Sequence, residues 1–254
     1  MVRNYKSAIF ELLDDPIIDT PRVISQFLSS LGSTTLRRPP SSPSLDITPI
    51  LTQIIEWGPL AELPLPRLTA KLCWLLAICG FLRPSDLERT DADTTRWSPD
   101  SLELFILAPK DKRNGQRYCR HVTIQPFEQA LLCPVLTFSC YMSRFPYPSD
   151  MTKHPVLRDT MYRPLIRDLA RQNRGVSARQ ISTHIQSIMK LVDNNSGGPL
   201  SARALGSTRA TLAGASWSDI LSQGSWSASS TFDTFYRLTR SVSTNITEMV
   251  LSAT

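Results

Sequence analysis

One short segment, residues 102–124, has the pattern of a β-hairpin in a chain whose other apolar positions mostly repeat with the period of a helix. Residues 102–107 (LELFIL) read as one strand, and residues 118–124 read as the return strand. Between them, Asn114-Gly115 is the strongest short sequence signal for a hairpin turn. The sequence therefore predicts an α+β protein that is mostly α, with one small antiparallel β-sheet or hairpin.

Helical patterns lie on both sides of this hairpin. Ser177 is a suitable N-cap for an amphipathic helix, and Gly214 is a suitable stop for a later one. The segment 163–169 (RPLIRDL) is ambiguous, and we favour a strand there, with Arg171 and Arg174 on a loop. The helices that we expect span residues 47–55, 68–82, 85–89, 133–145, 177–193, 201–213, 218–222 and about 230 onward.

The first part of the chain differs from the rest in its composition. Residues 4–31 carry two helical patterns, and a segment rich in Pro and Ser follows them, with Arg37 and Arg38. Two helices cannot make a stable domain alone. We therefore interpret residues 1–45 as the helical remnant of a larger N-terminal domain plus a linker, and residues 46–254 as the main domain.

Composition narrows the class of protein only moderately. The 254 residues carry a net charge of +6, which fits a polyanionic partner but says nothing of clustering. The five cysteines form no CxxC pair and read as free thiols of a reducing compartment. Neither these cysteines nor the three histidines suggest a metal site. No apolar run reaches the ~18 residues of a membrane span, and no secretory signal is seen, so we expect an intracellular protein without membrane contact.

Two arginines, a lysine and a tyrosine follow one another along the chain in an order that indicates a function: Arg83, Lys110, Arg203 and Tyr236. The texts around them, LLAICGFLRPSDLERTD, LAPKDKRNGQR and PLSARALGSTRATLAGASWSDILSQGSWSASSTFDTFY, resemble the motifs of the tyrosine recombinases, which break and rejoin DNA. Within that family the chain is most similar to the recombinases of DIRS-like and Crypton-like mobile elements, in Cys133-Pro134-Val135 and in the ending from Ile220 to Tyr236. The resemblance covers about residues 47–240.

The resemblance implies the catalytic-domain fold of that family and a role for each matching residue. Tyr236 would attack a DNA phosphate and hold the strand as a 3′-phosphotyrosine, without ATP, metal or other cofactor. Arg83 and Arg203 would bind the phosphate oxygens. Lys110 would protonate the departing 5′ oxygen, with Lys112 as the competing candidate. Trp226 would either donate its indole N–H to the phosphate or pack against Tyr236.

The same resemblance implies the partners. Double-stranded DNA would be the substrate, held through its phosphates by a basic patch that consists of Lys112, Arg113, Arg117 and Arg120. The protein would act as a homo-multimer on DNA, in the nucleus if the cell is eukaryotic. Residues 1–45 would be the remnant of the core-binding domain that clamps DNA in this family. Among the aromatic residues near the nucleophile, Phe232 and Phe235 are expected to pack inward, which leaves Tyr236 facing the cleft.

One position departs from the family's pattern. The usual His-x-x-Arg motif here reads Leu200-Ser201-Ala202-Arg203. Leucine cannot donate a hydrogen bond, Ser201 could substitute only in part, and His184 reads as a helix-face residue. A catalytically degenerate or domesticated DNA-binding protein that retains the fold is therefore the alternative. A purely helical interaction scaffold would leave Lys110 and Tyr236 unexplained.

Overall fold

The computed structural model describes residues 45–112, 115–145, 151–171, 174–192 and 200–239, together with Arg22 and Gln26. The chain divides into two compact units, Met1–Ser41 and Ser42–Thr254. The helices predicted within residues 4–31 lie outside the described residues, apart from Arg22 and Gln26, which are helical. The nature of the first unit stays a prediction, and the elements below all belong to the second.

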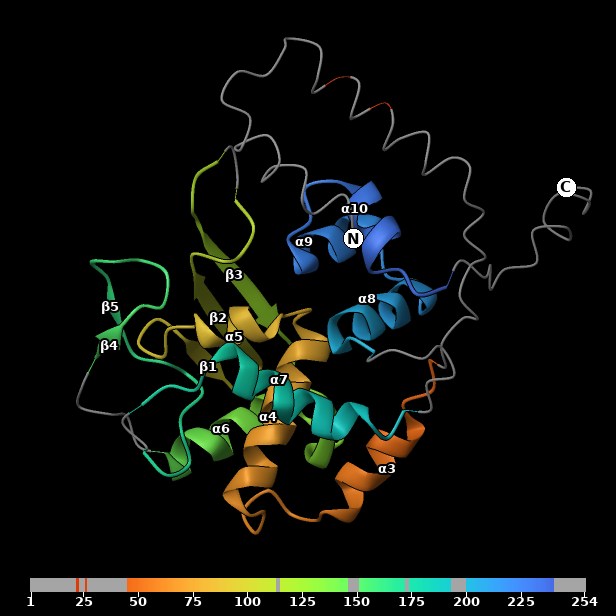
Figure 1. Cartoon of the computed structure of the whole chain (residues 1–254). Coiled ribbons are helices and arrows are strands. Elements are labelled where there is room, and N and C mark those ends of the chain that lie inside the picture. Colours follow the sequence, from red (N-terminus) through yellow and green to blue (C-terminus); the bar gives the residue numbers. More distant parts are fainter. Residues whose placement is uncertain are drawn as a thin grey trace, which may run out of the picture. The chain divides into compact units, whose positions relative to one another are not determined.

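Helices are the main secondary structure of the described part of the second unit (Figure 1). The longest, α4, is the strongly apolar helix expected from the sequence, and its residues from Leu68 to Ile78 are buried. The other helices predicted after residue 46 are also confirmed, with small shifts of their ends. The predicted helices are observed as α3 (Thr48–Glu56), α4 (Leu65–Cys79), α5 (Pro84–Glu88), α6 (Pro134–Arg144), α7 (Ala178–Met189), α8 (Ala202–Leu212), α9 (Trp217–Gly224) and α10 (Ser229–Phe235). The 3-10 turn η2 (Ala130–Leu132) was not predicted.

The predicted hairpin is confirmed as strands β2 (Ser101–Leu107) and β3 (Cys119–Ile124), which pair antiparallel with Leu104 opposite Val122. Alternate residues of both strands are buried, as expected for a sheet with one face on the core. A third strand, β1 (Arg96–Ser98), extends this sheet at β2 and was not predicted. The chain is therefore mostly helical with small antiparallel sheets, which confirms the predicted class.

The region after α6 differs from the prediction. Strands β4 (Thr152–Lys153) and β5 (Met161–Tyr162) form a second sheet, of two strands, which the sequence did not reveal. The segment 163–169 is not the regular strand that we favoured, because it makes only isolated bridges, from Pro164 to Asp91 and from Arg167 to Gly175. Such pairings are too short to leave a periodic signal in the sequence.

The packing of α8 against α4 positions the C-terminal helices next to the end of α4. A Cβ atom on Gly206 would lie 2.1 Å from the carbonyl oxygen of Ile78, so glycine is required for this close approach. A smaller hydrophobic cluster, separate from the main core, lies around α9 and α10 and consists of Phe81, Ile220, Trp226 and Phe232. These two contacts hold the C-terminal helices next to the end of α4.

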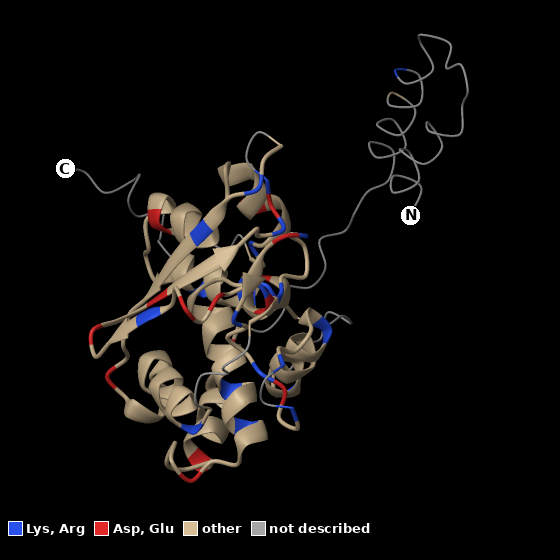
Figure 2. Ribbon diagram, turned by 90° about the vertical axis from the view of Figure 1, so that its left-hand side faces the viewer, with Lys and Arg blue, Asp and Glu red and all other residues tan. Residues whose placement is uncertain are grey.

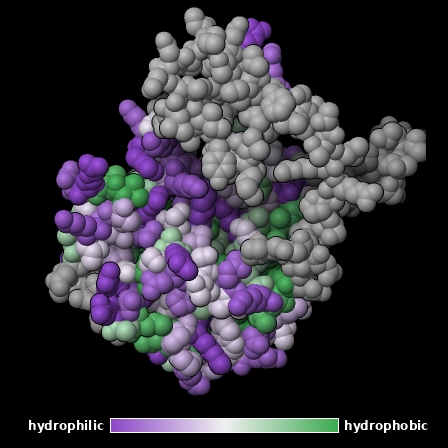
Figure 3. Space-filling view, in the orientation of Figure 1, coloured by the Kyte–Doolittle hydropathy of each residue, from purple (hydrophilic) through white to green (hydrophobic). Residues whose placement is uncertain are grey.

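Charged and apolar residues are distributed over the surface without one dominant patch in the views shown. Figure 2 shows Lys and Arg interspersed with Asp and Glu over the described elements. The face in Figure 3 is largely hydrophilic, and its apolar residues lie in separate small groups. No helix in the described ranges is long and apolar enough to cross a membrane.

Candidate active site

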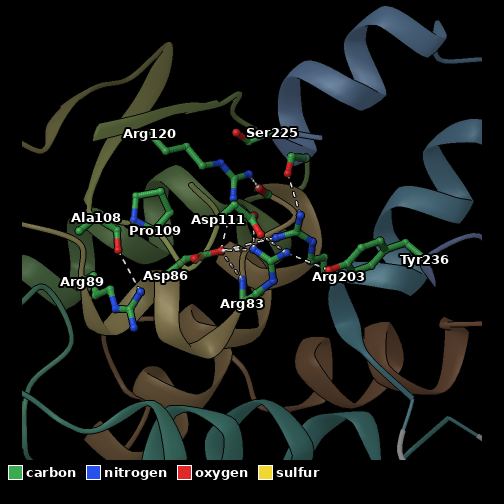
Figure 4. A network of polar contacts seen from close by, with 12 residues as sticks. Arg83, Asp86, Arg89, Ala108, Pro109, Asp111, Arg120, Arg203, Ser225 and Tyr236 are labelled. Atoms are coloured by element: carbon green, nitrogen blue, oxygen red, sulfur yellow. Dashed lines mark hydrogen bonds and ion pairs between the residues drawn. The ribbon is translucent and has the colours of Figure 1, made fainter. Parts of the chain in front are cut away.

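Arg83 lies at the turn between α4 and α5. Phe81, with a φ of 48°, turns the chain there, and the backbone N–H of Arg83 donates to the Asp86 carboxylate at 2.9 Å, which begins α5. The guanidinium group then extends toward the C-terminal helices, where Nη2 donates to the hydroxyl of Tyr236 at 2.9 Å (Figure 4). Both Nη atoms also donate to Asp111, at 2.7 and 3.3 Å.

Arg203 approaches the same point from the first turn of α8. Ser201 caps this helix by accepting the backbone N–H of Ala204. The Arg203 side chain is only 2% exposed, and its Nη2 donates to the carbonyl oxygen of Gly224 at 2.7 Å. Its guanidinium carbon lies 4.8 Å from the ring centroid of Tyr236. Arg83 and Arg203 therefore both contact Tyr236, from elements far apart in the sequence.

Tyr236 is the first residue after α10, and α8 holds its backbone. The hydroxyl of Thr208 donates to the Tyr236 carbonyl oxygen at 3.1 Å and accepts the backbone N–H of Leu238 at 3.0 Å. Of the two phenylalanines expected to pack inward, Phe232 is fully buried, but Phe235 is 75% exposed, so that part of the expectation is wrong. Sequence reasoning did not find Thr208, whose only signal was its place on α8, five residues after Arg203.

Trp226 is placed as a packing partner of the nucleophile candidate. Its ring lies 4.8 Å from that of Tyr236 and 5.1 Å from that of Phe232, and the Arg203 guanidinium stacks over it at 4.7 Å. Within the described residues, the buried indole N–H has no hydrogen-bond partner. A Cβ atom on Gly224 would overlap the Trp226 ring at 2.0 Å, so the glycine makes room for it.

Asp86 is the central residue of this site and was not predicted. Its carboxylate is fully buried, and Oδ2 lies 3.3 Å from Arg120, 3.5 Å from Arg203 and 4.0 Å from Arg83. Burial, and then the charges of Arg83 and Arg120, lower the pKa of Arg203 to about 10. For Arg83, burial lowers the pKa, but the hydrogen bond to Asp111 and the charge of Asp86 outweigh it, and the net direction is upward.

The site therefore concentrates positive charge. Three guanidinium groups face two carboxylates, Asp86 and Asp111, and the Nε and Nη1 atoms of Arg203 are buried without a hydrogen-bond partner among the described residues. Planar guanidinium groups with free N–H donors bind phosphate oxygens well. The arrangement can hold an anion next to the Tyr236 hydroxyl.

Comparisons with known proteins find a similarity of fold to solved structures. No protein-family model and no curated protein matches the chain. Among solved structures, "FLP Recombinase-Holliday Junction Complex I" is similar at 12% identity and a TM-score of 0.48, covering 91% of this chain and 57% of that chain. "Flpe-Holliday Junction Complex" is similar at the same identity and TM-score, covering 89% and 58%. The chain thus spans less than two thirds of the length of these structures, and its function has to be argued from its own residues.

Arg120 lies elsewhere than on the exposed basic patch where we expected it. It is 3% exposed on β3, where it donates to Asp86 at 3.3 Å, to the carbonyl oxygen of Gly80 at 3.2 Å and to that of Gln223. Burial lowers its pKa. Its place in the strand could have revealed this, because Arg120 alternates in phase with the buried Val122 and Ile124.

The remaining residues of the expected basic patch lie on the segment that joins β2 to β3. Lys110, Lys112 and Arg117 are exposed, and Arg117 donates to the carbonyl oxygen of Pro109 at 3.0 Å. Arg113 lies outside the described residues. Asp111, which accepts hydrogen bonds from both Nη atoms of Arg83, lies between Lys110 and Lys112 in the sequence, so the structure does not separate the two lysines as candidates for the acid.

Leu200, which stands where the family usually has histidine, is buried in the main core at 8% exposure. Its carbonyl oxygen accepts a hydrogen bond from Gln186 Nε2 at 3.4 Å. A cavity of about 330 Å³ lies beside it, lined by Arg83, Arg203 and Tyr236 and, among others, by Gln186 and Ser201. His184 is half-buried on α7, burial lowers its pKa, and it does not line this cavity.

Metal-ligating side chains can be assessed in the ranges that the structure describes. Within them, no group of three or more His, Cys, Asp or Glu side chains is placed to hold a metal ion. The cysteines at 73, 79, 119, 133 and 140 are free thiols, of which Cys73 and Cys133 are buried.

Proposed function

We propose that this chain breaks and rejoins double-stranded DNA, with Tyr236 as the nucleophile. One observation carries the proposal: the Tyr236 hydroxyl oxygen accepts a hydrogen bond from Arg83 at 2.9 Å while Arg203 lies over the same ring. These are the residues whose order and surrounding text resemble the tyrosine recombinases. A phosphate bound by both arginines would lie next to the nucleophilic oxygen, as in-line attack requires.

In the proposed reaction, the Tyr236 oxygen forms a bond to phosphorus as the bond from phosphorus to the 5′ oxygen breaks. The phenol of the half-buried Tyr236 gives its proton to water in the adjoining cavity, and the departing 5′ oxygen gains a proton from Lys110, or from Lys112 if that lysine is the acid. Negative charge grows on the phosphate oxygens, and preorganised guanidinium groups stabilise it; removing one such donor typically slows a reaction by ~10²–10³-fold. The product is a 3′-phosphotyrosine, which conserves the bond energy for rejoining.

The finer parts of the proposal rest on the motif resemblance. They are that the DNA belongs to a mobile element, that the reaction serves its recombination and integration, and that the protein acts as a homo-multimer. Lys112, Arg113 and Arg117 are proposed to contact the DNA phosphates. Arg120 is proposed instead to support the site from within, because its side chain is buried against Asp86.

A trapping assay tests the proposal. Protein is incubated with nicked duplexes taken from the DNA that flanks the gene, and a denaturant-stable protein–DNA adduct is sought. We expect an adduct with the unaltered protein and none with Tyr236→Phe, whereas DNA affinity stays nearly the same. Tyr162→Phe is the matched control, because Tyr162 donates to the carbonyl oxygen of Glu88 and takes no part in the site. An adduct that persists in Tyr236→Phe would overturn the assignment of the nucleophile.

A second candidate function is DNA binding without catalysis, which the buried Leu200 favours. It predicts DNA affinity that falls steeply with salt, but no adduct under any condition. Leu200→His separates two readings of this position. A gain in adduct formation means that the leucine is a lesion, and no gain in a protein that forms adduct means that the site works with leucine in place.

A further inference from the structure

The carboxylate of Asp111 takes up the outer edge of the Arg83 guanidinium group. Arg83 donates to it twice, from Nη1 to Oδ2 at 2.7 Å and from Nη2 to Oδ1 at 3.3 Å. The same Nη2 donates to the Tyr236 hydroxyl, so the carboxylate and the phenol share one nitrogen (Figure 4). A guanidinium group binds carboxylates and phosphates through the same pair of parallel N–H donors. Asp111 therefore occupies the donors that a phosphate beside Tyr236 would use.

We propose that Asp111 is an internal stand-in for the DNA phosphate, which keeps the site closed until a phosphate displaces it; this inference rests on the proposed function. A phosphodiester carries one negative charge, as the Asp111 carboxylate does. The exchange therefore leaves the balance of charge around the three arginines unchanged. A carboxylate offers no phosphorus to attack, so the site is unreactive while Asp111 is bound.

The two carboxylates of the site differ in how easily water can replace their contacts. The Asp86 side chain is fully buried among Arg83, Arg120 and Arg203, whereas the Asp111 side chain is 41% exposed and contacts Arg83 alone among them. An ion pair open to solvent contributes little stability, because water competes for both charges. Asp86 is thus a permanent part of the site, and Asp111 is the exchangeable one.

The exchange also bears on the proposed acid. Lys110 directly precedes Asp111 on the segment between β2 and β3, and it is exposed. While Asp111 is bound to Arg83, its neighbour is kept at the edge of the site. When a phosphate takes the place of Asp111, this stretch of chain is released, and Lys110 can move to the leaving oxygen of that same phosphate. Binding of substrate and arrival of the acid are thereby coupled.

Asp111→Asn tests the inference, because it keeps the size of the side chain and removes the competing charge. With an internal competitor, the apparent affinity for DNA equals the intrinsic affinity multiplied by the fraction of time that the competitor leaves the site free. We expect the variant to bind a short labelled duplex roughly 2- to 5-fold more tightly, which is the effect of removing one solvent-exposed ion pair. Its salt dependence should steepen by about one phosphate contact. Fluorescence anisotropy over a range of salt concentrations measures both.

Two further variants make the test specific. Asp100→Asn changes the net charge equally but lies in the exposed turn between β1 and β2. In an Arg83→Gln background, the gain from Asp111→Asn should vanish, because the guanidinium group for which the two anions compete is absent. Equal affinities of Asp111→Asn and Asp100→Asn would overturn the inference, as would a gain that persists in the Arg83→Gln background. Inorganic phosphate, followed by thermal shift, should bind more tightly to Asp111→Asn in the same way.

These results are separable from the fate of the proposed function. The trapped adduct reports on Tyr236 chemistry, whereas the affinities for duplex and for phosphate report on Asp111. An adduct without any effect of Asp111→Asn overturns the stand-in alone. A gain in phosphate affinity without an adduct supports the exchange at Arg83 and overturns the catalytic role of the site.

Discussion

Replacing Asp86 by asparagine would test whether one buried carboxylate holds the arginines of the site together. The asparagine keeps an oxygen that can accept the backbone N–H of Arg83, so the start of α5 is preserved. The negative charge, however, is lost from the space between three guanidinium groups at 3.3, 3.5 and 4.0 Å. The change therefore isolates the electrostatic part of what Asp86 does.

The size of the effect follows from these distances. At an effective dielectric constant of about 20, each such pair has a gross attraction of about 4–5 kcal/mol. Desolvation of the carboxylate and repulsion among the arginines offset most of the total. Removing one partner from a buried ion pair usually destabilises a protein by about 3–5 kcal/mol, because the opposite charge is left uncompensated. We expect a loss in that range, a large part of the roughly 5–15 kcal/mol that folded domains have.

Urea denaturation of the purified variant measures this loss as a lower midpoint with the same slope. Asp111→Asn is the matched control, because it removes a carboxylate from the same Arg83 at a solvent-exposed place and should change the free energy of unfolding by no more than about 1 kcal/mol. If both variants lost the same small amount of stability, the picture of one carboxylate that organises three arginines would be refuted.

Three other predictions concern Gly206 and Thr208 on α8 and the buried Lys71 on α4. Gly206→Ala places a Cβ atom 2.1 Å from the Ile78 carbonyl oxygen, so α8 must move from α4; we expect a loss of about 1–3 kcal/mol in urea denaturation and less trapped adduct. Thr208→Val removes both hydrogen bonds to the backbone around Tyr236, and adduct formation should slow about tenfold, whereas Thr208→Ser should behave like the unaltered protein. Lys71→Met removes a buried ammonium group without a hydrogen-bond partner among the described residues and should stabilise the fold by about 1–3 kcal/mol at pH 7. Burial lowers the pKa of Lys71 from the usual 10.5 to about 8, so between these two pH values the unfolded state binds the proton and the folded state does not. The unaltered protein should therefore gain stability as the pH rises from about 8 to 10.5, whereas Lys71→Met should not.

Much of the fold could be predicted because its signals are local. The hairpin carries its own turn residues, and the helix capped by Ser177 has a repeating apolar face that ends in buried isoleucines. Strands of two or three residues, such as β1, β4 and β5, have no such signal, since they are too short to show an alternation of apolar and polar residues. The position of Arg83, Arg203 and Tyr236 in one site was anticipated only through the motif resemblance.

The residues that the sequence did not reveal are those whose role depends on burial of charge. Asp86 reads as an ordinary residue of a short polar helix, because nothing nearby in the sequence shows that Arg120 and Arg203 will surround it. Arginine is a residue type usually found on the surface, and only the position of Arg120 in the alternating pattern of β3 indicates that its side chain is buried. A pattern of residue types can name the groups that carry chemistry, but the group that positions them emerges from tertiary packing.

The separate small cluster beneath α9 and α10 has a consequence for how the protein opens. Because Phe81, Ile220, Trp226 and Phe232 pack with one another and apart from the main core, the segment that carries Tyr236 has a local stability of its own. An open cavity of about 710 Å³ lies between α9 and β3, and the hydrogen bonds that join α9 to the rest of the unit include those from Arg120 to Gln223 and from Arg203 to Gly224. Amide hydrogens of α9 and α10 should therefore exchange as one cooperative unit, before those of α4. Arg203, which would bind the phosphate in the proposed reaction, therefore also holds the end of α9 in place next to the helix that leads to Tyr236.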